Sequence, residues 1–191
     1  NEYTVRQRSL IEYFKLIPGF ARISIDDKIR LLRNNFGIML SLNESTSIPD
    51  DDQHVVVTLT NVFGNSLGMG LHDCIRSIRA YRCDPVLVKL VLTVQSLSSG
   101  ANRYQSTDDL HRVYDNSLEI FESQCFYIEL LWRYVRSRSM SAKDAVKFFN
   151  KLICDLLQLV QISALTDDFV FSFTGDLDQT DPLIRSILVA K

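Results

Sequence analysis

The chain has 191 residues, of which 46% are apolar and 23% are charged, and its 21 basic and 23 acidic side chains give a net charge of −2. This composition is too apolar and too evenly charged for a disordered chain, and it lacks the basic excess of many nucleic-acid-binding domains. With only 7 Gly and 4 Pro, the chain is short of the turn residues that all-β folds need, which favours long helices.

Apolar residues recur at helical spacing along most of the chain, so the sequence predicts an all-α fold. Ser24 and Ser141 are each followed three residues later by Asp, and Asp84 precedes Pro85, so all three are expected to begin helices. Pro18–Gly19 is expected to end the first helix. We expect helices over residues 3–16, 24–43, 71–81, 85–97, 108–136 and 141–169, with a short last piece over 181–189.

The pattern is less simple in residues 54–63 and 108–136. Residues 54–63 are rich in β-branched side chains and follow an expected turn at 48–52, so either a short strand or a buried helix is possible there, and at most a small β-hairpin near 48–62. The helix over 108–136 carries an apolar stripe that we expect to face the core. Its members are Leu110, Val113, Leu118, Phe121, Cys125, Ile128, Leu131 and Val135.

The four cysteines lie inside apolar stretches and include no closely spaced pair, so we expect reduced core thiols and no zinc site. No metal ligands, catalytic residues or cofactor are expected, and no segment is predicted to span a membrane. The cysteines are Cys74, Cys83, Cys125 and Cys154.

A short motif offers an alternative. Residues 64–68 read Gly-Asn-Ser-Leu-Gly, which matches the G-x-S-x-G turn of serine hydrolases, with Ser66 as nucleophile and His111 or His72 as base. That turn requires a parallel sheet around it, and no series of strands alternates with helices here. A loop between helices is the competing interpretation.

The first fifty residues carry a stronger pattern. Two expected helices meet at the Pro-Gly turn, and four apolar side chains can converge on a shallow groove between two basic residues. Such a groove suits an amphipathic helix of a partner, because a cation at the rim can cap the carbonyl end of that helix. A plain helical hairpin with solvated cations is the alternative. The apolar residues are Ile11, Phe20, Ile29 and Leu32, and the basic ones are Lys15 and Arg33.

The same segment resembles the signature of nuclear receptor ligand-binding domains, with the closest likeness to the thyroid-hormone, vitamin D, peroxisome-proliferator and ecdysone receptor branch. The signature residues are Tyr13-Phe14-Lys15, Pro18-Gly19-Phe20, Asp27-Lys28 and Leu31-Leu32-Arg33. The resemblance implies one domain over 1–191, folded as a three-layer antiparallel helical sandwich. It also implies that the family's first helix is missing from this chain, and that the zinc-containing DNA-binding domain is separate from it.

By this resemblance, Lys15 and Arg33 form the basic half of a charge clamp, and the four apolar groove residues receive the L-x-x-L-L helix of a coactivator or corepressor. Residues 181–189 resemble the activation helix, which would complete the groove with Leu183, Ile184, Ile187 and Leu188. Ser186 stands where the family has Glu, and loss of that charged cap is expected to weaken binding by roughly 1–2 kcal/mol.

The resemblance further implies a pocket for a lipid or steroid-like ligand, a nuclear location, and either a retinoid X receptor-like partner or a second copy bound along residues 143–169. A filled pocket is the alternative, and the domain would then act without ligand, as a constitutive binder or a repressor. By position, the pocket residues are Arg6, Leu10, Leu40, Asn43, Ser47, Leu165 and Phe169.

Overall fold

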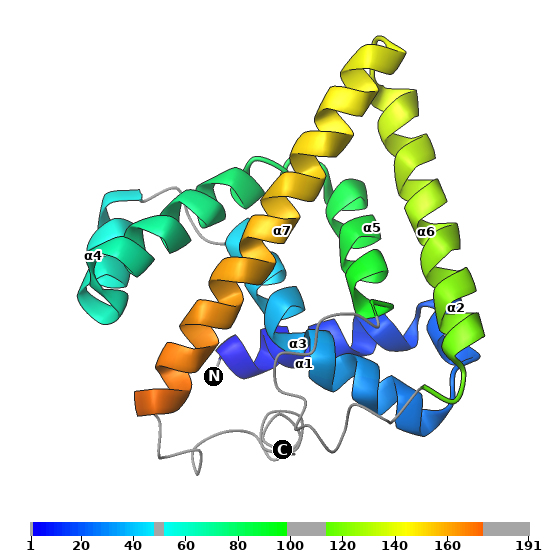
Figure 1. Cartoon of the computed structure of the whole chain (residues 1–191), viewed down its shortest axis with the longest axis horizontal. Helices are drawn as coiled ribbons and strands as arrows, with labels where there is room; N and C mark the ends of the chain where they lie inside the picture. Colours follow the sequence, from blue (N-terminus) through cyan, green and yellow to red (C-terminus); the bar gives the residue numbers. More distant parts are fainter. Residues whose placement is uncertain (1, 48–51, 99–113, 174–191) are drawn as a thin grey trace. The chain divides into compact units, whose positions relative to one another are not determined.

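The computed structural model describes residues 2–47, 52–98 and 114–173, and within these ranges it contains seven helices and no strand (Figure 1). The predicted all-α class is therefore confirmed. The helices are α1 (Glu2–Lys15), α2 (Pro18–Ala21), α3 (Ile25–Ser47), α4 (Asp52–Arg79), α5 (Pro85–Ser96), α6 (Ser117–Arg138) and α7 (Ala142–Phe173).

The three predicted helix starts are confirmed, and each is held by the expected cap. The Ser24 Oγ accepts a hydrogen bond from the Asp27 N–H at 3.2 Å, and the Ser141 Oγ accepts one from the Asp144 N–H at 3.1 Å. The Asp84 carboxylate accepts a hydrogen bond from the Leu87 N–H at 3.1 Å. Because these bonds span only three residues, the sequence contains all the information that they need.

The β-hairpin alternative is wrong for the described residues, because 54–63 lie inside α4. This first part of α4 exposes Val57 and half-buries Val55, so it presents no continuous strand face to a sheet. The Thr60 hydroxyl donates to the Val56 carbonyl at 2.9 Å, which is a bond that a helix supplies locally. Residues 54–63 are therefore helical despite the strand preference of their side chains, because tertiary context can outweigh that preference. The turn expected at 48–52 lies almost entirely outside the described residues.

The G-x-S-x-G segment bends α4, as Figure 1 shows. Gly64 adopts φ 77° and ψ 165°, a left-handed conformation that L side chains rarely adopt. At Gly68, a Cβ atom would lie 2.7 Å from the Leu59 carbonyl oxygen and from the Thr60 Cα, both backbone atoms that cannot move aside. The two glycines therefore allow the second part of α4 to fold closely against the first.

The start of α6 differs from the prediction, because residues 114–116 are not helical and the helix begins at Ser117. Asn116 occupies the capping position, and its carbonyl accepts the Ile120 N–H at 2.9 Å. The side-chain oxygen of Asn116 accepts the Ser24 N–H at 2.7 Å, and the Asn116 N–H donates to Asp27 at 2.8 Å. Contacts with residues about ninety positions earlier therefore set this helix start. The expected stripe residues Leu110 and Val113 lie outside the described residues.

The predicted core stripe of α6 is wrong over its first half. Leu118, Phe121 and Ile128 are exposed, with 61% of Phe121 accessible, and Cys125 is exposed as well. The buried side chains of α6 are Ile120, Leu131 and Val135. Leu131 and Val135 of the expected stripe are therefore buried as predicted, whereas in the first half of α6 Ile120, outside the stripe, packs inward, a difference that helical spacing alone could not predict.

The described residues divide into two compact units, the first formed by 2–40, 90–98 and 114–130 and the second by 41–47, 52–89 and 131–173. Each unit has its own buried apolar side chains among the described residues. Those of the first unit include Phe14, Leu31, Phe36, Met39, Leu97 and Ile120. Those of the second include Cys74, Ile78, Leu152 and Leu159.

Two further expectations need correction. Cys74 is buried as predicted, but Cys83, Cys125 and Cys154 are exposed free thiols rather than core residues. Residues Ala142–Leu165 of α7 are long and apolar enough to cross a membrane by length and composition, which the sequence analysis did not single out. One side of this segment, with Ala145, Leu152 and Leu159, is buried in the second unit, and its Lys side chains are exposed.

Candidate functional site

The end of α1, the short α2 and the start of α3 form the candidate site in the first unit. Phe14 and Phe20 are buried beneath it, with their ring centroids 6.4 Å apart. Pro18 begins α2, where its missing N–H costs nothing. Gly19 lies against α6, and a Cβ there would be 2.9 Å from the Ser123 Oγ. The Pro-Gly-Phe sequence thus makes a tight turn that closely approaches a neighbouring helix.

Asp27 fixes the start of α3. Its side chain is fully buried, one carboxylate oxygen accepts the Asn116 N–H at 2.8 Å, and the other lies 3.3 Å from the Arg30 guanidinium. A buried carboxylate is stable only when hydrogen-bonded or paired, and Asp27 has both kinds of partner. The acidic residue of the signature therefore has a structural role, because it ties the first turn of α3 to the first turn of α6.

Polar contacts also join α1 and α3 to α5 within the first unit. The Tyr13 hydroxyl lies 2.8 Å from the Thr93 hydroxyl, and burial raises the pKa of Tyr13 above its ordinary value. The buried Asn35 amide donates to the Ser98 carbonyl at 2.7 Å and accepts from the Gln95 amide at 3.2 Å. These bonds hold the elements beneath the site in fixed register.

The predicted groove residues divide into two groups. Ile11 and Phe20 are buried and expose almost nothing to a partner, whereas Ile29 is 40% exposed and Leu32 is half-buried. Lys15 is exposed at the last position of α1, and its ammonium lies 2.6 Å from the Glu12 carboxylate. Arg33 is exposed on α3, next to Leu32. The accessible apolar surface is therefore on α3, and Ile11 and Phe20 support it from below.

Sequence reasoning missed Ile25, which is 72% exposed at the first position of α3. Ile25, Ile29 and Leu32 follow the i, i+4, i+7 spacing that places side chains on one face of a helix. That spacing was visible in the sequence, but only the structure shows that the row is exposed. Leu16, at the end of α1, is also exposed.

The activation-helix residues Leu183, Ile184, Ser186, Ile187 and Leu188 lie outside the described residues.

The predicted ligand residues are divided between the two units. Leu10 is buried and Leu40 is half-buried in the first unit, while Asn43 is half-buried and Leu165 is 45% exposed in the second. Arg6, Ser47 and Phe169 lie in helices, but their side chains are outside the description. The cavity described below is lined by other residues.

The hydrolase interpretation loses its geometric basis in the described part of the chain. Ser66 is exposed inside α4, just after the bend at Gly64, and not on a turn between a strand and a helix. His72 is buried six residues further along the same helix, a spacing that does not place two side chains side by side. His111 lies outside the described residues. Among described residues, no group of three His, Cys, Asp or Glu side chains could hold a metal ion.

No model of a known protein family matches this chain, and no curated protein sequence matches it.

Proposed function

We propose that the chain is a ligand-binding domain of the nuclear receptor type, which recruits coregulators through the surface formed by α1, α2 and α3. The observation that supports this most is the apolar row formed by the exposed Ile25 and Ile29 and the half-buried Leu32, beside the exposed cations Lys15 and Arg33. An L-x-x-L-L helix offers a matching apolar face, and the negative carbonyl end of that helix suits a basic rim. The three-layer antiparallel sandwich is the arrangement that this proposal expects.

The mechanism is a shift between conformations. A lipid or steroid-like ligand that binds more tightly when residues 181–189 are docked would favour the docked state, and the docked segment would complete the groove. The shift can be no larger than the difference between the ligand's affinities for the two states. Recruitment would take place in the nucleus, and DNA would be bound only by a separate domain.

The ligand-independent alternative has an observation in its favour. Leu10, one of the proposed ligand residues, is buried and already covered by its neighbours. A domain with a filled pocket would bind coregulators equally well with and without added lipid.

Dimerisation is also part of the proposal, with a retinoid X receptor-like partner or a second copy of the chain. Val146, Ile153 and Leu157 are exposed on α7, and 63% of Leu157 is accessible. Their spacing places them along one side of the helix, next to the face that packs in the second unit. An apolar row of this kind suits the side of another helix.

The test is a titration of a fluorescein-labelled L-x-x-L-L peptide, followed by fluorescence anisotropy, with and without a panel of fatty acids and steroids. We expect Ile29→Asp to weaken binding at least about tenfold, because a carboxylate would be placed against the apolar face of the peptide. Lys15→Ala should weaken it about fivefold through loss of the cap. Ligand-dependent affinity supports regulation, and lipid-insensitive affinity supports the ligand-independent alternative.

Arg76→Ala is the matched control, because Arg76 is also exposed and also pairs with an acidic residue three positions earlier. Its affinity should equal that of the wild type. Equal binding by wild type, Lys15→Ala and Ile29→Asp would contradict the proposed surface.

A further inference from the structure

The turn between α6 and α7 concentrates positive charge in a chain whose net charge is −2. Residues 133–151 contain six basic residues, and the only acidic one is Asp144. The rest of the chain therefore carries a clear acidic excess. The basic residues are Arg133, Arg136, Arg138, Lys143, Lys147 and Lys151.

Most of this charge is not neutralised within the described structure. Lys151 pairs with Asp155 at 2.6 Å, and the carboxylate of Asp144 bonds to the Ser141 hydroxyl at 2.6 Å. In contrast, Arg136, Arg138, Lys143 and Lys147 have no ion-pair partner among the described residues. All four are exposed. Unpaired cations on neighbouring turns repel each other, so an anionic partner would be favourable here.

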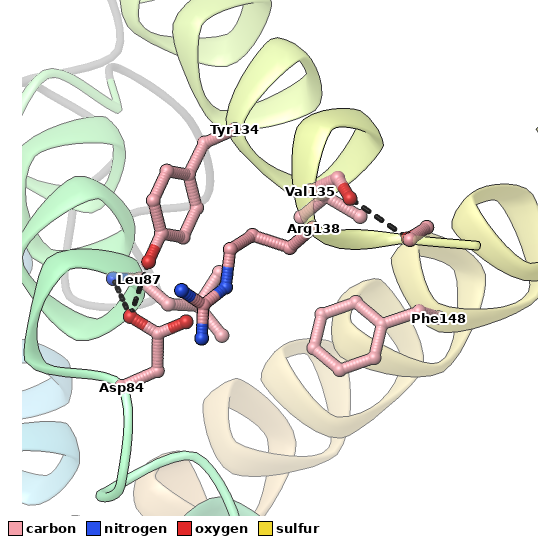
Figure 2. Close-up of a pocket in the computed structure, with 7 residues that line it drawn as sticks. Asp84, Leu87, Tyr134, Val135, Arg138 and Phe148 are labelled. Atoms are coloured by element: carbon pink, nitrogen blue, oxygen red, sulfur yellow. Dashed lines mark hydrogen bonds between the residues drawn. The ribbon is translucent and has the colours of Figure 1, made fainter.

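A cavity of about 200 Å³ lies beside these cations, within the second unit (Figure 2). Figure 2 shows the Arg138 side chain extending toward Asp84 between the rings of Tyr134 and Phe148. The guanidinium carbon lies 6.0 Å from the centre of the Tyr134 ring. The cavity is lined by Asp84, Leu87, Tyr134, Val135, Arg138, Ser139 and Phe148.

The lining is held in place by its own hydrogen bonds. One Asp84 oxygen accepts both the Leu87 N–H at 3.1 Å and the Tyr134 hydroxyl at 2.7 Å. The same bond to Asp84 is the main cause of the raised pKa of Tyr134. The Ser139 hydroxyl donates to the Val135 carbonyl at 2.8 Å. The Arg138 guanidinium has no ion-pair partner among the described residues and lies over the Tyr134 ring, so its N–H donors can bind the carboxylate of a partner.

The size of the cavity indicates what it can hold. Pockets for whole small-molecule ligands are commonly about 300–1,000 Å³, so a cavity of about 200 Å³ is better suited to one side chain. Apolar surface surrounds it, since Met140 is fully exposed at the turn and Phe148 is 38% exposed. Cations mixed with exposed apolar side chains complement a peptide in which acidic and apolar residues alternate.

We propose that the α6–α7 turn is a docking site for an acidic, amphipathic peptide segment of a partner protein, with one carboxylate side chain bound to Arg138 in the cavity. The apolar residues of that segment contact Phe148 and Met140, and Arg136, Lys143 and Lys147 attract its remaining charges. A nucleic-acid backbone or an anionic membrane would use the cations, but neither needs a concave site that fits one side chain. This site is independent of the coregulator surface, which lies in the first unit.

The experiment measures fluorescence anisotropy of a labelled twelve-residue peptide in which Glu alternates with Leu and Phe, using the whole chain. We expect Arg138→Glu to weaken binding at least about tenfold, which is the usual effect of losing a charge-assisted hydrogen bond. Lys147→Glu, outside the cavity, should weaken it about threefold and reduce its dependence on salt. Circular dichroism verifies that both variants fold.

Arg76→Glu is the control, because it makes the same change in net charge at an exposed site on α4. It should leave the affinity unchanged, and the same peptide with every Glu replaced by Gln should bind at least about tenfold more weakly. An equal loss in Arg76→Glu, or unchanged binding of the Gln peptide, would overturn the proposal. So would weaker binding of the peptide than of a twelve-nucleotide single strand or of phosphatidylserine vesicles, and so would no binding at all.

Discussion

Asp27 in the first unit and Asp155 in the second are both buried carboxylates, but different donors hold them. Asp27 accepts a backbone N–H from Asn116, and so it fixes where α6 begins. Asp155 accepts side-chain donors only, the Tyr81 hydroxyl at 2.5 Å and the Lys151 ammonium at 2.6 Å. The Asn116 N–H is fixed in the main chain and cannot turn to another acceptor, whereas the exposed Lys151 side chain can turn to water.

The two units therefore differ in the kind of hydrogen bond that holds their buried aspartate. In the first unit, Asp27 and Asn35 bond to the main chain of residues far away in the sequence, in addition to the bonds between side chains. The second unit joins α7 to the end of α4 through side chains, with the Lys151 ammonium 5.8 Å from the centre of the Tyr81 ring and the Tyr81 and Phe148 rings 5.8 Å apart. We therefore expect the first unit to be more sensitive to loss of its aspartate.

The largest expected effect is that of Asp27→Ala, which should lower the free energy of unfolding by about 3 kcal/mol, because the Asn116 N–H and the Arg30 guanidinium both lose the buried carboxylate that they bind. Urea unfolding followed by circular dichroism measures it. Asp26→Ala is the control, since Asp26 is exposed in the same helical turn and its loss should cost less than about 0.5 kcal/mol. Equal effects of the two substitutions would break the comparison.

The next effect concerns alkaline pH in the second unit. Burial, with a contribution from the charge of Asp155, raises the pKa of Cys74 to about 11 from its ordinary 9.0, and burial together with the bond to Asp155 raises the pKa of Tyr81. Both groups are neutral in the folded state near pH 7. Their contribution to the free energy of unfolding is therefore complete below pH 9, and it decreases as the pH rises through the pKa of the folded state.

For Cys74 the window is pH 9 to 11, and the loss should reach about 2 kcal/mol. Urea unfolding at several pH values, followed by the fluorescence of Trp132, reports on the second unit, because Trp132 is the only Trp in the sequence. Cys74→Ala should flatten the curve between pH 9 and 11, and Cys83→Ala, at an exposed thiol, should not. A curve that keeps its slope in Cys74→Ala would exclude this thiol as the cause.

The smallest effect compares the two serine caps. Ser24→Ala should cost about 1.5 kcal/mol and Ser141→Ala about 0.5 kcal/mol, both within the usual range for lost N-caps. The Ser24 cap is the stronger because Ser24 is half-buried, so water replaces its lost hydroxyl less easily, whereas Ser141 is exposed to water. Thermal unfolding of the two variants measures the difference. A larger loss of stability in Ser141→Ala than in Ser24→Ala would contradict the prediction that the Ser24 cap is the stronger.

The caps also show what could be predicted at the candidate site. Ser24 and the Pro-Gly turn act within a few residues, so the elements that carry Lys15 and Ile29 were predicted correctly. The exposure of those side chains could not be predicted, because it depends on which neighbours cover them. Ile11 and Phe20 were expected in the groove and are buried, while Ile25 was missed and is exposed.

The sequence by itself determined the helical class and the caps at Ser24, Asp84 and Ser141, because helical periodicity and three-residue hydrogen bonds are local properties. Only the tertiary structure decided where α6 begins, because its start is bonded to Ser24 and Asp27, about ninety residues away. The tertiary structure also decided which side chains of α6 are buried, because burial depends on the elements packed against the helix. It also decided that residues 54–63 are helical, since a β-branched segment follows the packing available to it.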